Sequence, residues 1–267
     1  MRPKAEKKMQ KKLVVLGILF CLAVGGCAVK PTDPDEIKIY EQNNDPLEPM
    51  NRGVFKFNQG AYDYVLKPAV KGYRKTVPDV VKTGIENVMT NLKQPIYMIN
   101  ALLQGDLEAT GTIAGRFALN SVFGLGGIFD LASREEMPKI KRDFGQTLAV
   151  WGVKDSGPYI VLPILGPTTV RDGIGMGVDA FADPVDWILY DQNKWLAYGR
   201  AGVNGFLEFE NRHDLLESVE KSSTDYYAAL RSMYQQNRQK EIRELRGEVQ
   251  EVQEAYDFDF PDDEEEE

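Results

Sequence analysis

Apolar side chains recur along this chain mainly at the spacing of amphipathic helices. The first clear helix is expected after Asp79, which we predict to be its cap, and we expect Pro95 to interrupt it. Its apolar positions lie at i, i+4, i+7 and i+11, and they are Val81, Ile85, Val88 and Leu92. This spacing predicts that one face of the helix is buried.

Three more helices are expected from similar patterns. Gly105 should end one apolar stretch and Asp106 should start the next, whose face is Leu107, Thr110, Ala114, Phe117 and Ser121. Asn204 is predicted to cap a helix whose face is Phe206, Phe209, His213, Leu216 and Val219. Asp225 should precede another helix, with Tyr226, Leu230, Met233 and Tyr234. Most of the chain is therefore predicted to be helical.

Sustained alternation of apolar and polar residues, which is typical of a half-buried sheet, does not occur in this chain. The best extended candidate is GPYIVLPIL at 157–165, and its two prolines confine it to a hairpin or the edge of a loop. We therefore predict an all-α (mainly α) fold with one short extended or hairpin segment.

The stretch PMNRGVFKFNQGAYDYVLKP at 49–68 predicts an aromatic-rich helix with basic flanks. Its apolar face, Val54, Phe57, Ala61 and Val65, allows two interpretations. The helix could lie at a membrane interface, or it could be an ordinary helix facing a protein core. The pattern alone leaves both open.

The N-terminus predicts a signal peptide. An apolar run at 13–26 has fourteen residues, whereas a membrane-spanning helix needs about 20, and a basic segment precedes it. Val24-Gly25-Gly26-Cys27 resembles the bacterial lipobox, so cleavage is expected before Cys27, and Cys21 would leave with the leader. The alternative is an ordinary secreted protein with an incidental cysteine.

Lipidation would place S-linked diacylglycerol and an N-linked acyl chain such as palmitate on Cys27. Two or three chains give a firm anchor, because each buried CH₂ contributes about 0.8 kcal/mol. In bacterial lipoproteins an Asp after the cysteine marks retention at the inner membrane, and this chain has Ala28 there. We therefore expect the mature protein on the periplasmic side of the outer membrane.

Composition divides the remaining chain into three parts. A polar tether is expected at 27–45, a folded domain at 46–245, and a disordered acidic tail at 246–267, where eleven acidic residues accompany one basic residue. The net charge is −9, and loss of the basic leader would make the protein more acidic. Nucleic acid is therefore excluded as a partner.

Residues for catalysis or metal binding are scarce. The chain has one histidine, His213, on an apolar helix face, where we expect it to be a buried core residue. The glycine-rich runs at 123–130 and 172–179 complete neither a dinucleotide fingerprint nor a P-loop. Two glycine pairs, Gly111 with Gly115 and Gly173 with Gly177, indicate close helix packing instead. No metal, cofactor or enzymatic activity is expected.

Several long motifs resemble one bacterial family. They are NDPLEPMNR at 44–52, RFALNSVFGLGGIFDLA at 116–132, FGQTLAVWGV at 144–153 and GPYIVLPILGPTTVRD at 157–172. In this order, behind a lipobox, they are similar to the MlaA (VacJ) lipoproteins. The resemblance continues to about residue 243, and this chain departs from it in the charged stretch 133–143 and the acidic tail.

The resemblance implies a ring-like helical body that lies in the plane of the outer membrane around an amphipathic pore. It also implies a function: removal of misplaced phospholipids from the outer leaflet, beside a trimeric porin, and their delivery to a soluble periplasmic carrier of the Mla type. Such transport would maintain the lipid asymmetry of the outer membrane. A structural lipoprotein that scaffolds a porin or envelope complex is the alternative, and a membrane-bound hydrolase is a third, less favoured reading.

Four residues are candidates for roles in the pore. Gly152 and Gly157 could let the 144–166 segment hinge, and Arg116 or Arg171 could attract phosphate. For both arginines, a structural salt bridge or helix cap is the competing interpretation.

Overall fold

The computed structural model describes residues 45–248. The predicted leader, Cys27, almost all of the tether and residues 249–267 of the tail lie outside this range. The chain divides into two compact units. Within the described range, one combines residues 45–68 with Gly157–Thr169, and the other consists of Ala69–Ser156 and residues 170–248.

The first unit contains a helix and a hairpin. Helix α3 (Glu48–Ala61) passes into a π-helical turn, η1 (Tyr62–Leu66). Strands β1 (Tyr159–Leu162) and β2 (Gly166–Thr169) pair antiparallel, with Tyr159 opposite Thr169 and Leu162 opposite Gly166. The predicted helix at 49–68 and the predicted hairpin are both confirmed.

Two asparagines of α3 bind the hairpin. Asn51 is fully buried; its side-chain NH₂ donates to the Tyr159 carbonyl at 3.0 Å and its side-chain oxygen accepts from the Val161 N–H at 3.0 Å. Asn58 repeats this arrangement two turns later, donating to the Leu162 carbonyl at 2.9 Å and accepting from the Ile164 N–H at 2.7 Å. Asn51 therefore binds the backbone of β1, and Asn58 binds the backbone where β1 passes into the turn.

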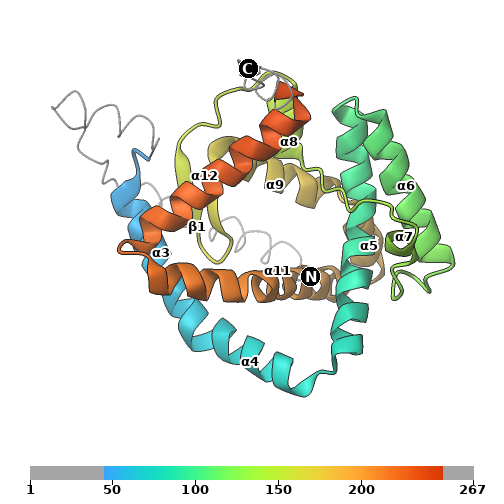
Figure 1. The fold of residues 1–267 in the computed structure, drawn as a ribbon, viewed down its shortest axis with the longest axis horizontal. Helices are drawn as coiled ribbons and strands as arrows, with labels where there is room; N and C mark the ends of the chain where they lie inside the picture. Colours follow the sequence, from blue (N-terminus) through green and yellow to red (C-terminus); the bar gives the residue numbers. More distant parts are fainter. Residues whose placement is uncertain (1–44, 249–267) are drawn as a thin grey trace, which may run out of the picture. The chain divides into compact units, whose positions relative to one another are not determined.

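The second unit is helical in its described part (Figure 1). Helix α4 (Lys67–Thr76) leads into it, and its elements are α5 (Asp79–Leu103), α6 (Leu107–Val122), α7 (Leu131–Arg134), α8 (Phe144–Val150), α9 (Val170–Ala182), α10 (Pro184–Gln192), α11 (Lys194–Ser222) and α12 (Tyr226–Leu245). Helices α5 and α6 form an antiparallel hairpin. The predicted mainly α fold is confirmed.

Some of the predicted helix ends are correct. The Asp106 carboxylate accepts from the Ala109 N–H at the start of α6, and the Asp225 carboxylate accepts from the Ala228 N–H at the start of α12. Each aspartate satisfies one of the free N–H groups at a helix N-terminus, as its position in the sequence predicted.

Two predictions for α5 were wrong. Pro78, and not Asp79, is the N-cap, and Asp79 lies in the first turn, where it forms an ion pair with Lys82 at 2.6 Å. Pro95 does not end the helix, because α5 continues to Leu103. An internal proline costs about 3 kcal/mol. Packing of the following turns against α6, with Ala101 at the centre of a buried apolar cluster, outweighs that local cost.

The predicted start of α11 at Asn204 was also wrong. The helix begins at Lys194, ten residues earlier, and the Asn193 side chain caps it by accepting from the Trp195 N–H at 3.0 Å. The first turns of α11 carry exposed aromatic residues in place of a buried apolar stripe, so the periodic pattern starts late. His213, on the periodic part, is 4% exposed, which confirms the predicted core histidine.

Helices α8 and α9 cross with their backbones in contact. A Cβ atom added at Gly175 would lie 2.4 Å from the Gly145 nitrogen and 2.8 Å from its Cα. At Gly111 and Gly177, two of the four positions that the sequence favoured, an added Cβ would meet nothing within 4 Å. The predicted close approach exists, but Gly175 makes it.

Candidate functional site

Large aromatic side chains lie exposed along the end of α9, α10 and the start of α11. We define the aromatic surface by five residues that are between 54% and 71% exposed: Phe181, Trp187, Tyr190, Trp195 and Tyr198. Their rings meet edge to face, at centroid distances of 5.4 Å for Phe181 and Trp187 and 5.9 Å for Trp195 and Tyr198. Such a concentration of exposed aromatic area indicates contact with an apolar environment.

A buried ion-pair cluster fixes α10 beneath the aromatic surface. Arg200 donates to the Asp183 carboxylate at 2.8 Å, to the Asp186 carboxylate at 2.5 Å and to the Leu92 carbonyl of α5 at 2.9 Å. Burial lowers the pKa of Arg200, but its hydrogen bonds to Asp183 and Asp186 outweigh that effect and raise the pKa overall. Arg200 therefore ties α10 and α11 to α5 as a permanent cation.

The glycine-rich run 123–130 forms a second exposed apolar element. It turns between α6 and α7 and exposes Phe123, Leu125, Ile128 and Phe129. A Cβ added at Gly124 would lie 2.3 Å from the Phe129 carbonyl oxygen, so only glycine fits there. Asn91 of α5 donates to the Ser121 hydroxyl at 2.9 Å beside this turn. As at Arg200, buried polar contacts hold an element whose apolar side chains are exposed.

Arg116, a candidate phosphate ligand, lies inside this polar interior. It is 2% exposed and donates to both oxygens of Asp130, at 2.9 and 3.1 Å. Burial would raise the pKa of Asp130, but hydrogen bonds from Ser133, Asn120 and Lys139 bring it well below its usual range. The geometry favours the salt-bridge interpretation of Arg116, and its phosphate role stays a prediction.

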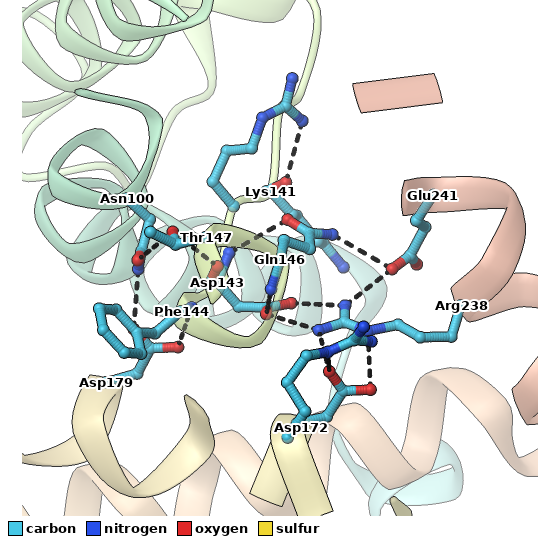
Figure 2. A network of polar contacts seen from close by, with 12 residues as sticks. Asn100, Lys141, Asp143, Phe144, Gln146, Thr147, Asp172, Asp179, Arg238 and Glu241 are labelled. Carbon is cyan, nitrogen blue, oxygen red and sulfur yellow. Dashed lines mark hydrogen bonds and ion pairs between the residues drawn. The ribbon is translucent and has the colours of Figure 1, made fainter. Parts of the chain in front are cut away.

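Figure 2 shows a polar network that joins α5, α8, α9 and α12. At its centre, Arg238 of α12 donates to Asp143 at 2.6 and 2.7 Å, to Asp172 at 3.0 and 3.1 Å and to Glu241 at 2.9 Å. Burial would lower the pKa of Arg238, but its carboxylate partners, Asp143 first, raise it far above the usual range. Asp143 also caps α8, so one arginine fixes both the start of α8 and the C-terminal helix.

The network continues to the other side of α8. Asp179 of α9 accepts from the Asn100 side chain at 2.7 Å and from the Phe144 N–H at 3.0 Å, and Thr147 donates to Asn100 at 3.0 Å (Figure 2). Burial is the main cause that raises the pKa of Asp179. Helix α8 is therefore held by polar contacts along both sides.

Arg171, the second candidate phosphate ligand, belongs to the edge of this network. It is 5% exposed, and its Nε donates to Asp172 at 3.0 Å while an Nη donates to the Val153 carbonyl at 3.4 Å. The salt-bridge interpretation again fits the geometry, and phosphate binding stays a prediction. Arg171 also contacts the loop that carries the two candidate hinge glycines.

Gly152 and Gly157 delimit that loop. Both have left-handed backbone conformations, with φ of +104° and +69°. A side chain would be strained at either position, and the division between the two compact units falls directly before Gly157. These observations are compatible with the predicted hinge and do not test it.

The distribution of polarity in the second unit is unusual for a protein surrounded by water. Asparagine, glutamine, threonine and arginine side chains are prominent among its buried residues, whereas many large apolar side chains are exposed. Among residues 45–248, no helix is both long and apolar enough to cross a membrane, and no cluster of side chains is suited to a metal ion. The exposed apolar side chains are typical of a protein surface that contacts lipid.

Comparison with known proteins gives the family. The model of the MlaA lipoprotein family matches residues 43–241. The chain belongs to the MlaA lipoprotein family. It is 35% identical over 246 residues to the intermembrane phospholipid transport system lipoprotein MlaA of Haemophilus influenzae, covering 88% of this chain and 92% of that protein. The protein of the same name from Escherichia coli K12 is 34% identical, with 85% and 86% covered.

A solved structure agrees with this assignment. It was described under the heading "Structural basis for maintenance of bacterial outer membrane lipid asymmetry", and it superposes with a TM-score of 0.62 at 35% identity. The match covers 72% of this chain and 96% of the other. MlaA lipoproteins are outer-membrane lipoproteins of Gram-negative bacteria named for lipid transport, and the family is not known for an enzymatic reaction.

The aromatic surface was not predicted from the sequence. Its residues, in 181–198, show no continuous helical apolar period, because α9 ends, Asp183 caps α10 and Asn193 caps α11 within this stretch. The available signal was the density of Trp and Tyr without a burial pattern. Arg238 was missed for another reason: its partners lie 66 and 95 positions away, and no local pattern predicts such a contact.

Proposed function

We propose that this protein is an outer-membrane lipoprotein, lipidated at Cys27 on the periplasmic side, that removes misplaced phospholipids from the outer leaflet. It passes them through an amphipathic pore to a soluble periplasmic carrier of the Mla type, beside a trimeric porin. The result is maintenance of lipid asymmetry. Family membership supports this proposal, because the named relatives belong to an intermembrane phospholipid transport system.

The observation that carries the proposal is the aromatic surface on its polar scaffold. A phospholipid that leaves a bilayer would expose two acyl chains to water, at about 0.8 kcal/mol for each CH₂. A protein that shields it needs apolar walls for the chains and polar groups for the headgroup. The second unit supplies apolar walls as exposed aromatic rings, and buried ionic groups hold the helices that carry them.

The first unit supports placement of α3 at the membrane interface. Of the apolar face that runs through α3 and η1, Phe57 and Val65 are mainly exposed, which a core-facing helix would not allow. The hairpin tip also exposes Ile164 and Leu165. We therefore include α3 and the hairpin tip among the lipid-contacting parts of the protein.

Movement of the hairpin about Gly152 and Gly157 is the gating step of the proposal. Replacing Gly157 by valine would restrict the backbone to negative φ and alter the level of phospholipid in the outer leaflet. Unaltered levels, at normal abundance of the protein, would refute the hinge while leaving transport untouched.

The alternative function is a scaffold for a porin or envelope complex that moves no lipid. The deciding experiment is a gene deletion, followed by labelling of surface phosphatidylethanolamine with an impermeant amine reagent. Transport predicts a rise in surface phospholipid and in detergent sensitivity while porin trimers assemble normally. A scaffold predicts defective trimers with unchanged surface phospholipid.

A further inference from the structure

The turn between α6 and α7 exposes an uncharged apolar surface. We define the apolar turn as residues 122–129. Five of its large apolar side chains are between 45% and 71% exposed: Val122, Phe123, Leu125, Ile128 and Phe129. The sequence has no charged residue from 117 to 129, although charged residues make up 27% of the chain. None of the five side chains carries a polar group, so transfer from water to an apolar environment is favourable for each of them.

Leu125, at the tip of the apolar turn, has a left-handed backbone with φ of +52° while its side chain is 65% exposed. Gly126 and Gly127 follow with φ of +71° and +98°. Residues other than glycine rarely adopt this conformation, and asparagine and aspartate adopt it more readily than leucine. A turn surrounded by water would therefore be less strained with glycine or asparagine at 125. Leucine at this position indicates a role for the exposed side chain itself.

The backbone N–H groups of the apolar turn find acceptors within it. Five of them donate to the carbonyls of Leu119, Ser121 and Gly124 at 3.0 to 3.2 Å. The donors are Phe123, Gly124, Gly126, Gly127 and Phe129. These bonds fold the backbone on itself, so much of its donor capacity does not depend on water.

Two asparagines of α5 bind carbonyl groups of the same turn. Asn87 donates to the Ile128 carbonyl at 3.1 Å, and Asn91 donates to the Gly126 carbonyl at 3.4 Å. Irregular backbone is excluded from hydrocarbon where its polar groups lack partners, because each such group costs free energy there. The apolar turn meets much of this requirement with partners from the protein, while its apolar side chains are exposed.

We propose that the apolar turn inserts into the acyl-chain region of the membrane, deeper than the aromatic surface. The aromatic surface carries tryptophan and tyrosine, and the Lys194 ammonium lies 5.6 Å from the centre of the Trp195 ring, a combination typical of the headgroup level. The apolar turn has no tryptophan, tyrosine or arginine, the residues enriched at the centres of protein interfaces. Lipid is therefore a better partner for it than a protein surface.

Both elements are fixed to neighbouring positions of α5. Asn91 binds the apolar turn, and the carbonyl of Leu92 binds Arg200 beneath the aromatic surface. A single helix thus holds the deeper element and the headgroup-level element in one unit. The inference rests on the proposed function for the membrane to which Cys27 is attached.

The test is fluorescence quenching in vesicles that hold the acylated full-length protein. The mature chain is expected to have no cysteine besides the acylated Cys27, so a single cysteine can carry an environment-sensitive label. The three variants are Leu125→Cys in the apolar turn, Tyr198→Cys in the aromatic surface, and the control Lys221→Cys, at an exposed lysine of α11. The quenchers are phosphatidylcholines with a nitroxide either on the headgroup or on the acyl chain.

The label at 125 should be quenched about twofold more by the chain nitroxide than by the headgroup nitroxide, because insertion by about 5 to 10 Å carries it past the headgroups. The label at 198 should be quenched more by the headgroup nitroxide, and the label at 221 by neither. Quenching at 125 no stronger than at 221, or the same ratio of chain to headgroup quenching at 125 and 198, would overturn the insertion.

A trimeric porin is the competing occupant of the apolar turn. If adding the porin to the vesicles removed the quenching at 125, the turn would face protein and the insertion would be overturned. The proposed function fails separately. Expected quenching, together with unchanged surface phospholipid after gene deletion, would refute transport and support the insertion, and the opposite pair of results would refute the insertion alone.

Discussion

The crossing of α8 and α9 allows a prediction whose size follows from two distances. In Gly175→Ala, the new Cβ would lie 2.4 Å from the Gly145 nitrogen and 2.8 Å from its Cα. Both neighbours are backbone atoms, so neither can rotate away, and the helices must separate by about 1 Å to reach ordinary contact distance. Overpacking of this kind costs about 1 to 3 kcal/mol.

Gly177→Ala is the matched control on the same helix. Its Cβ would meet nothing within 4 Å, and replacing glycine in a helix by alanine stabilises by up to about 1 kcal/mol. Gly175→Ala gains the same helix propensity, so this gain cancels when the two variants are compared. The difference between them is the overpacking cost, about 1 to 3 kcal/mol.

Thermal unfolding followed by circular dichroism, in one detergent, measures this difference. For a folded region of this size, 1 kcal/mol corresponds to about 2 to 4 °C, so Gly175→Ala should melt about 2 to 12 °C below Gly177→Ala. Equal melting temperatures, or a higher one for Gly175→Ala, would refute the close crossing of α8 and α9.

Three further outcomes are expected. Arg238→Gln removes the ion pairs to Asp143 and Asp172 and leaves Asp172 with only Arg171 and Tyr234, so it should cost about 2 to 3 kcal/mol in the free energy of unfolding. Lys240→Gln removes an exposed cation of the same helix and should cost less than about 0.5 kcal/mol, and chemical denaturation compares the two variants. Burial would raise the pKa of Asp172, but its hydrogen bonds and ion pair with Arg238 outweigh burial and lower the pKa below 3.8. The stability that this carboxylate contributes is therefore present above about pH 4 and is lost as the pH falls further. The melting temperature of the wild type should fall with pH in this acid range, and that of Asp172→Asn should fall less. Trp187→Asp should weaken binding to phospholipid vesicles by about tenfold with an unchanged far-ultraviolet spectrum, and unchanged binding would exclude this residue from the lipid contact.

Local signals predicted much of the fold correctly. Asp106 and Asp225 mark helix starts because a cap is a contact within one turn, and the prolines of 157–165 confined that stretch to a hairpin for an equally local reason. The prediction that Pro95 interrupts the helix was wrong because packing of α5 against α6 outweighed the local cost of the proline. The prediction that Asn204 caps a helix was wrong because α11 begins earlier, in a stretch whose apolar residues are exposed and show no buried stripe.

The candidate site was less predictable from sequence. Periodicity identifies side chains that face a core, whereas the aromatic surface faces away from one. The partners of Arg238 lie 66 and 95 positions away, so no local pattern predicts them. For Arg116 and Arg171 the sequence left two interpretations open, a phosphate ligand or a structural ion pair. Only the three-dimensional contacts distinguish the two interpretations.

The central claim, that this protein extracts phospholipid and hands it on, is tested most directly by reconstitution. Vesicles containing labelled phospholipid and the acylated full-length protein are mixed with the soluble periplasmic carrier, and label on the recovered carrier is measured. The account predicts that the carrier acquires label several times faster from these vesicles than from vesicles without the protein. Equal acquisition from both would contradict it.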